Sequence, residues 1–175
     1  MFECFREQAL PVEIRFATAA RASAPVAELC KELGIPCEIL DPRRQADFEA
    51  KLLSLCHKEN IALIALAGFM SLLSADFLNK VGIPVLNIHP ALLPKYGGKG
   101  MFGMAVHEAV FFCGDKVSGV TVHRVDPLYD HGEIIAQTEV DISDCPSPEE
   151  IAARVLEVEH RLYAPAIFSV LSKNP

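Results

Sequence analysis

The chain has 175 residues, of which 51% are hydrophobic, and its formal net charge is −7. This length suits one domain with a real hydrophobic core. The negative charge argues against broad binding to nucleic acid, which needs a basic surface. The most apolar stretch, IALIALAGFM, is too short to span a membrane, and the N-terminal MFECFREQAL lacks the apolar segment of a secretory signal.

Cysteine and histidine spacings narrow the class of protein further. The six cysteines are scattered and contain no Cys-x-x-Cys pair, as expected for reduced cysteines in a cytoplasmic protein. No histidine has the spacing of a metal ligand, so we predict no metal. The composition therefore favours a cytoplasmic protein that acts on small molecules and binds neither nucleic acid nor a membrane.

The alternation of apolar and amphipathic segments predicts an α/β fold. In chain order we expect a strand at 12–18, a helix at 24–33, a strand at 36–40, a helix at 44–58, a strand at 61–66, a helix at 74–80 and a strand at 84–88. After these we expect a helix at 104–113, strands at 117–125 and 133–140, and a helix at 148–172 that is broken or kinked near Pro165. The pattern predicts a mostly parallel sheet with the last two strands packed beside it.

Two segments, 67–70 (AGFM) and 87–90 (NIHP), follow buried strands and should form pocket walls, because ligands bind beyond the carboxyl ends of parallel strands. Asn87 and His89 lie two residues apart and so point to the same face of their strand. An amide and an imidazole that converge on one point suit a carbonyl that becomes an oxyanion. Taken alone, a polar pair at a strand end more often belongs to an ordinary turn.

A carboxylate would strengthen the catalytic interpretation, and the segment VDPLYDHGEII supplies Asp126 and Asp130. A carboxylate near His89 would raise its pKa and fix its orientation. Local sequence favours ordinary turn chemistry for Asp126 and leaves both interpretations open for Asp130. His123 could be either a pocket residue or a structural one, and Lys99 is better explained as a solvated loop lysine than as a phosphate clamp.

Four segments carry a family resemblance in their order and spacing: AGFMSLLS, NIHPALLPKYGG, HRVDPLYDHGEIIAQ and IAARVLEVEHRLYAP. They resemble the glycinamide ribonucleotide formyltransferases, a branch of the folate-dependent formyltransferase superfamily, from about Val12 onward. The resemblance implies a Rossmann-like three-layer sandwich with a mostly parallel central sheet, formed as a single catalytic domain over 1–175. It also implies formyl transfer from 10-formyltetrahydrofolate to the amine of glycinamide ribonucleotide in de novo purine biosynthesis.

By this resemblance the catalytic residues are Asn87, His89 and Asp130. Asn87 and protonated His89 would stabilise the oxyanion, while Asp130 would keep His89 charged and help move a proton through water. Glu159 would meet the amine end of the nucleotide substrate. The residues that match the folate pocket are Phe69, Met70, Ser71, Leu72, Leu73, Leu86, Val125, Asp126 and Leu128.

The chain departs from the family pattern at three places. The family opens with a strand and a Gly-x-Gly-Ser-Asn loop that holds the substrate phosphate, and this sequence contains neither. Ala19-Ala20 stands where Ser-Asn is usual, and Ser71 stands where an Arg is common. The absent strand would expose a sheet edge, which would favour a homodimer. Either the sequence is incomplete at its start, or it belongs to a paralogue with altered substrate binding.

Other functions remain open from the sequence. A formyltetrahydrofolate deformylase would use the same three residues on water, and a formyltransferase could act on a different amine. A non-catalytic folate-binding protein would also tolerate the missing phosphate loop, although it would not need all of Asn87, His89 and Asp130.

Overall fold

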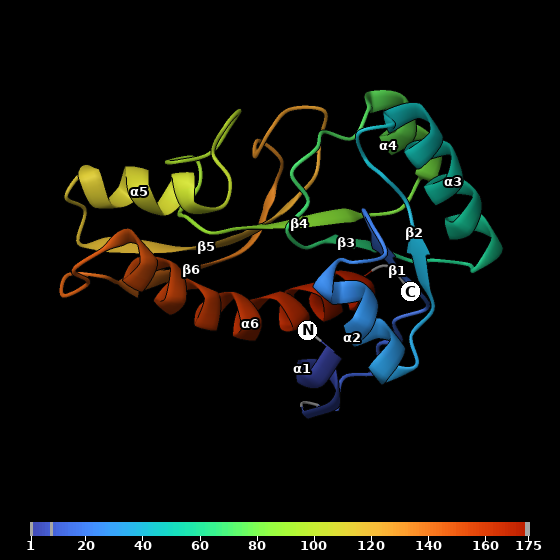
Figure 1. Cartoon of the computed structure of the whole chain (residues 1–175), viewed down its shortest axis with the longest axis horizontal. Coiled ribbons are helices and arrows are strands. Elements are labelled where there is room, and N and C mark those ends of the chain that lie inside the picture. Colours follow the sequence, from blue (N-terminus) through green and yellow to red (C-terminus); the bar gives the residue numbers. More distant parts are fainter. Residues whose placement is uncertain (1, 8, 174–175) are drawn as a thin grey trace.

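The computed structural model describes residues 2–7 and 9–173 (Figure 1). The helices are α1 (Phe2–Glu7), α2 (Pro25–Leu33), α3 (Gln45–Lys58), α4 (Ala75–Val81), α5 (Met104–Phe112) and α6 (Pro148–Lys173). The strands are β1 (Ala17–Ala19), β2 (Cys37–Ile39), β3 (Ile64–Leu66), β4 (Val85–His89), β5 (Val117–Arg124) and β6 (Ile134–Asp141). Within these described residues, none of the helices combines the length and the apolar character needed to cross a membrane.

The strands form two sheets. β1 pairs in parallel with β2, while β3, β4, β5 and β6 form a four-stranded sheet in that order. The β3–β4 pair is parallel, and the β4–β5 and β5–β6 pairs are antiparallel. The predicted α/β class is therefore confirmed, as is the prediction of a final strand pair beside the parallel part. We expected one central sheet, but among the described residues β1 does not pair with β3, so the strands form two separate sheets.

Two neighbouring residues of β4 show the layered arrangement, because successive side chains of a strand face opposite sides of the sheet. Val85 packs in a cluster with Phe48 of α3 and Phe77 of α4. Leu86 packs in a second cluster with residues of α6 and with Phe5 of α1. The sheet thus lies between α3 and α4 on one side and α6 and α1 on the other, as Figure 1 shows.

Two strand predictions were wrong in their bounds, and of the break or kink predicted near Pro165 only the break is contradicted. The predicted strand at 12–18 is confined to Ala17–Ala19. The segment before it begins with a tight turn, in which the Val12 N–H donates to the Leu10 carbonyl at 2.8 Å, and Val12 and Ile14 pack against the core without forming a strand. The predicted strand at 61–66 begins only at Ile64. Helix α6 continues through Pro165 without a break. Pro165 lies between buried Ala164 and Ala166, and close packing of this face against the sheet maintains the helix where propensity alone would end it.

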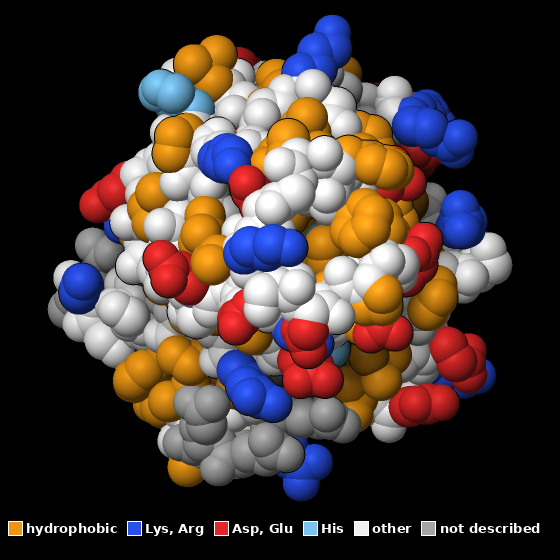
Figure 2. All heavy atoms as spheres, turned by 90° about the vertical axis from the view of Figure 1, so that its left-hand side faces the viewer, with side chains coloured by type: hydrophobic (Ala, Val, Ile, Leu, Met, Phe, Trp, Pro, Cys, Tyr) orange, Lys and Arg blue, Asp and Glu red, His pale blue; other side chains and the backbone are white. Residues whose placement is uncertain are grey.

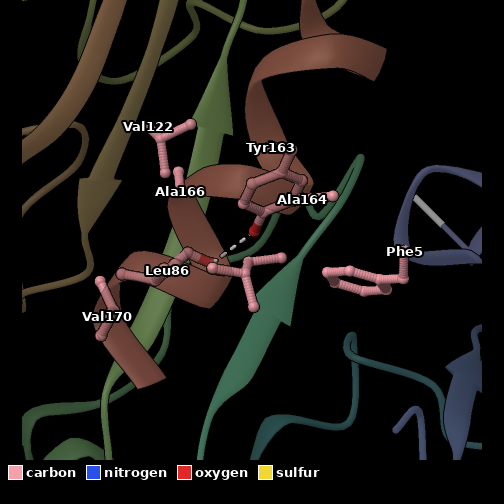
Figure 3. Close-up of a cluster of buried hydrophobic side chains, with 8 residues drawn as sticks. Phe5, Leu86, Val122, Tyr163, Ala164, Ala166 and Val170 are labelled. Atoms are coloured by element: carbon pink, nitrogen blue, oxygen red, sulfur yellow. Dashed lines mark hydrogen bonds between the residues drawn. The ribbon is translucent and has the colours of Figure 1, made fainter. Parts of the chain in front are cut away.

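Tyr163 attaches α6 to two strands, at the carboxyl end of β3 and near the start of β4. Its hydroxyl lies 2.7 Å from the Leu66 carbonyl oxygen at the end of β3 and 3.0 Å from the Leu86 carbonyl oxygen in β4. Figure 3 shows the contact with Leu86 inside the core cluster. Because the ring is 4% exposed, these hydrogen bonds are shielded from water, and they fix the position of α6 beside these two strands.

Candidate active site

A cavity of about 860 Å³ opens at the carboxyl ends of β3 and β4. Its walls include 66–73, 87–90 and 98–104, together with side chains of α6. The prediction that AGFM and NIHP form pocket walls is therefore confirmed. The volume lies in the range of small-molecule sites, about 300–1,000 Å³. On the face shown in Figure 2, side chains of both charge signs are interspersed with hydrophobic ones.

Asn87 and His89 occupy one face of β4, as their spacing predicts. The antiparallel register places Asn87 opposite His123 and His89 opposite Thr121 on β5. The Asn87 Nδ2 atom lies 3.2 Å from His123 Nε2. The Nδ1 atom of His123 lies 2.8 Å from the Arg124 carbonyl oxygen, which can only accept. In a neutral His123 ring the proton is thus on Nδ1, and Nε2 accepts a hydrogen bond from Asn87.

His89 is held by contacts to both of its ring nitrogens. Its Nε2 atom lies 2.8 Å from the Tyr96 carbonyl oxygen, so Nε2 carries a proton and donates. Its Nδ1 atom lies 3.6 Å from an Asp130 carboxylate oxygen. This answers the question left open by the sequence: Asp130 is the carboxylate near His89. Asp126 instead accepts from Leu128 N–H at 2.8 Å and contacts His131 Nδ1 at 2.7 Å, as turn chemistry predicts.

The loop geometry around Asp130 aims its carboxylate at both histidines. Asp130 has a φ of 52°, a left-handed conformation that Asp tolerates better than most residues. One carboxylate oxygen accepts from the Gly98 N–H at 2.9 Å, and the other lies 3.6 Å from His123 Nε2. A Cβ at Gly132 would lie 1.9 Å from the Arg124 carbonyl oxygen. Only glycine therefore lets the loop approach the strand closely enough to place Asp130 here.

Burial sets the protonation states of His89 and Asp130. Burial is the largest influence on the pKa of His89 and lowers it. Asp130 and the Tyr96 carbonyl act in the opposite direction, and His123 adds to the lowering. The net result is a pKa of His89 below its usual range. Burial raises the pKa of Asp130, but the neighbouring His123, the hydrogen bond from the Gly98 N–H and the attraction to His89 outweigh this, so its pKa is lowered. Desolvation of the His89 ring thus exceeds the attraction to Asp130, and the role of Asp130 in keeping His89 charged stays a prediction.

Two further histidines belong to the site, and the sequence did not identify either as a site residue. His123 is 3% exposed and connects Asn87 to Asp130, which settles the open question in favour of a cavity-lining residue. His107 of α5 also lines the cavity, and its buried Nδ1 atom has no hydrogen-bond partner among the residues that the structure describes. Burial and then the neighbouring His89 lower the pKa of His107. The period-two pattern of β5 could have indicated His123, whereas nothing local distinguishes His107.

The loop after His89 is anchored to β5 and β6 by buried side chains. The Thr121 hydroxyl donates to the Ala91 carbonyl at 2.6 Å and accepts from the Leu93 N–H at 3.1 Å. The Gln137 amide of β6 donates to Thr121 Oγ1 at 2.8 Å and to the Leu93 carbonyl at 3.1 Å. Because these polar groups satisfy one another away from water, the path of the chain beyond His89 is well determined.

Most of the residues that match the family's folate pocket line the cavity. These are Phe69, Met70, Ser71, Leu72, Leu73, Val125 and Leu128. Phe69 stacks on Phe48 with ring centroids 5.6 Å apart. Leu86 and Asp126 do not line the cavity: Leu86 is fully buried on the opposite face of β4, and Asp126 is engaged in its own loop. The cavity is therefore mainly apolar, with a polar cluster at its inner end.

Glu159 of α6 also lines the cavity, as does its neighbour His160. Burial raises the pKa of Glu159 to about 7, because a carboxylate loses hydration among apolar neighbours. Near neutral pH it can therefore hold or release a proton at the rim of the site. Within the described residues, no group of three or more His, Cys, Asp or Glu side chains is arranged to hold a metal ion.

Comparison with known proteins identifies the family of this chain. The model of the family described as formyl transferase matches 6–167. The chain belongs to the formyl transferase family. It is 35% identical over 157 residues to a phosphoribosylglycinamide formyltransferase of Bacillus subtilis, covering 88% of this chain and 78% of that protein. It is 36% identical over 152 residues to the chloroplastic phosphoribosylglycinamide formyltransferase of Arabidopsis thaliana, covering 85% of this chain and 52% of that protein.

Solved structures of this formyl transferase family share the fold. The crystal structure of the phosphoribosylglycinamide formyltransferase of Bacillus halodurans superposes with a TM-score of 0.87 at 31% identity, covering 99% of this chain and 88% of that one. The predicted Rossmann-like formyltransferase fold is thus confirmed. The chain spans about half the length of the Arabidopsis protein, so the activity of the whole protein is considered below as a proposal.

Proposed function

We propose that this formyl transferase transfers a formyl group from 10-formyltetrahydrofolate to the amine of glycinamide ribonucleotide. The observation that carries the proposal is the convergence of Asn87, His89 and Asp130 at the inner end of a mainly apolar cavity. The names of the relatives from Bacillus and Arabidopsis support the same reaction. The apolar walls suit the flat rings of a folate, and the polar cluster suits the formyl group.

The reaction joins the amine nitrogen to the formyl carbon and breaks the bond between that carbon and N10 of the folate. Asn87 donates to the formyl oxygen as negative charge develops on it. His89 is neutral at the start because burial lowers its pKa. The proton that the attacking amine loses passes to Nδ1 of His89, and the imidazolium stabilises the oxyanion until N10 of the folate receives that proton.

Proton movement completes the balance of the reaction. The amine loses one proton as it attacks, and N10 of the folate gains one as it leaves. Asp130 is held ionised near both His89 and His123, so it can pass this proton through water. Glu159, with a pKa of about 7, is placed to bind the amine and to accept its proton when the amine enters as an ammonium.

The test is formyl transfer from 10-formyltetrahydrofolate to glycinamide ribonucleotide, with His89→Ala as the inactive variant. Loss of one oxyanion-stabilising group should lower kcat by about 10²–10³-fold. His57→Ala is the matched control, because His57 is exposed and lies outside the cavity. Equal turnover in wild type and His89→Ala would overturn the proposal.

The alternative functions give different results in the same assay. A deformylase would release formate from 10-formyltetrahydrofolate without an amine acceptor. A folate-binding protein would retain the folate yet turn over no acceptor, and His89→Ala would change nothing. Activity on another amine would leave glycinamide ribonucleotide unformylated while a different acceptor is consumed.

We also propose that 1–175 act as one catalytic domain on these two small molecules. The absence of the family's first strand and phosphate loop from that domain stays a prediction, as do the cytoplasmic location and the homodimer. Size-exclusion chromatography coupled to light scattering would measure the oligomeric state directly.

A further inference from the structure

The loop between β4 and α5 supplies the hydrogen-bond acceptor that fixes His89. This acceptor is the backbone carbonyl of Tyr96, 2.8 Å from His89 Nε2. Tyr96 has a φ of 58°, which an L-residue adopts only when its surroundings hold it there. The orientation of His89 therefore depends on whatever keeps the Tyr96 backbone in this conformation.

The side chain of Tyr96 is held by a cluster outside the cavity, which we call the Tyr96 clamp: Lys95, Tyr96 and Asp115. The Tyr96 hydroxyl donates to Asp115 Oδ2 at 2.8 Å, and Lys95 Nζ lies 2.5 Å from the same oxygen. The Lys95 ammonium also lies 4.9 Å from the centre of the Tyr96 ring. Asp115 sits in the turn that leads from α5 into β5, the strand that carries His123.

The protonation states of Tyr96 and Asp115 favour the hydrogen bond between them at neutral pH. Burial raises the pKa of Tyr96 to about 12, so its hydroxyl keeps the proton that it donates. Hydrogen bonds from Lys95 and Tyr96 lower the pKa of Asp115, so its carboxylate stays ionised and accepting. A hydrogen bond to an ionised partner is stronger than one between neutral groups.

We propose that Asp115 is a positioning residue for His89 and acts through Tyr96. Because a carbonyl only accepts, the Tyr96 backbone keeps the proton of neutral His89 on Nε2 and leaves Nδ1 free on the side of Asp130. Asp115 keeps that carbonyl in place by holding the hydroxyl at the other end of the Tyr96 side chain. The catalytic consequence rests on the proposed function, whereas the effect on His89 does not.

The experiment compares wild type with Tyr96→Phe and Asp115→Asn. Tyr96→Phe removes only the hydroxyl, and Asp115→Asn removes the charge but keeps an oxygen acceptor. Asp144→Asn is the matched control, because Asp144 also pairs with a basic side chain distant in sequence, but with Arg154 of α6 and not with the Tyr96 clamp. Thermal melts establish that each variant is folded.

The first measurement is the ¹⁵N spectrum of His89, assigned by its disappearance in His89→Ala. In wild type and Asp144→Asn we expect Nε2 to give the signal of a protonated nitrogen. In Tyr96→Phe, and more weakly in Asp115→Asn, that signal should move toward an average of the two tautomers. An unchanged His89 spectrum in both folded variants would overturn the proposal, whatever the activity.

The second measurement is the pH profile of formyl transfer. A misplaced His89 should lower kcat by roughly tenfold in Tyr96→Phe and shift the acid limb of the profile, with KM changed by less than about twofold. A loss of kcat with an unshifted profile and spectrum would show a merely structural role and overturn the proposal. If wild type itself transfers no formyl group, the proposed function fails, while the spectrum still decides the role of Asp115.

Discussion

The two sheets of this protein differ in how strongly their surroundings determine them. β4 is paired on both sides, and its residues Val85, Leu86 and His89 are buried. β1 and β2 pair only with each other, over three residues each, and Ile39 is 47% exposed. Asn87, His89 and Asp130, which we assign to catalysis, lie on the four-stranded sheet or on a loop attached to it, and Glu159 lies on α6. Accurate placement of reacting groups is therefore found where strands are supported on both edges and both faces.

The largest expected effect is a difference in stability between the two sheets. Leu86→Ala leaves a cavity in a fully buried cluster and should lower the free energy of unfolding by about 3 kcal/mol. Ile39→Ala in β2 removes a half-exposed side chain and should cost less than about 1 kcal/mol. Urea denaturation followed by circular dichroism measures both. Equal losses would mean that the two-stranded sheet is supported as well as the four-stranded one.

A smaller effect should come from Glu159 at the rim of the site. Burial raises its pKa from 4.5 to about 7, so the folded state binds this proton more tightly than the unfolded state does. The stability that the proton confers is lost as pH rises from about 4.5 through 7. Glu159→Gln should therefore raise the free energy of unfolding by about 2 kcal/mol at pH 8 and have little effect at pH 4.

Glu157→Gln is the control for Glu159, because the Glu157 side chain is 73% exposed on the same helix. If Glu159→Gln were neutral at pH 8, the carboxylate would have to be better solvated than its burial indicates. That result would weaken the comparison, because α6, which packs on the four-stranded sheet, would then carry no poorly solvated carboxylate.

The smallest expected effect is the pH dependence contributed by the buried histidines. Burial lowers the pKa of both His89 and His107, so the unfolded state binds protons that the folded state excludes. Their contribution to stability is complete above about pH 6.5, the unfolded pKa, and falls as the pH drops below it. His107→Gln should flatten this decline in urea melts between pH 7 and 5, whereas exposed His57→Gln should leave it unchanged. A decline unaffected by His107→Gln would assign it to other groups.

The sequence predicted those parts of the site that depend on a single strand. Side-chain alternation is local, so Asn87 and His89 could be placed on one face of β4. The same rule places Leu86 on the other face, and the structure follows this rule, not the family match that made Leu86 a pocket residue. The sequence also anticipated that Asp130 could approach His89, since a turn precedes the last strand.

Contacts between distant segments could not be predicted in this way. The pairing of Asn87 with His123 follows from the register of β4 against β5, which depends on the whole sheet. The Tyr96 carbonyl reaches His89 because the loop folds back on its own strand. Likewise, the apolar alternation over 12–16 predicts a strand, but among the described residues these apolar side chains pack against the core without strand pairing. Tertiary context overrides strand propensity in such cases.

Tyr163, which attaches α6 to β3 and β4, also fixes the rotation of the helix about its axis. Tyr163 is fixed at the carbonyls of Leu66 and Leu86, and Glu159 lies four residues earlier, close to one helical turn away. One residue inserted between them would rotate Glu159 by about 100° and carry it away from the cavity. Deletions or insertions in this short interval should thus be excluded from functional relatives.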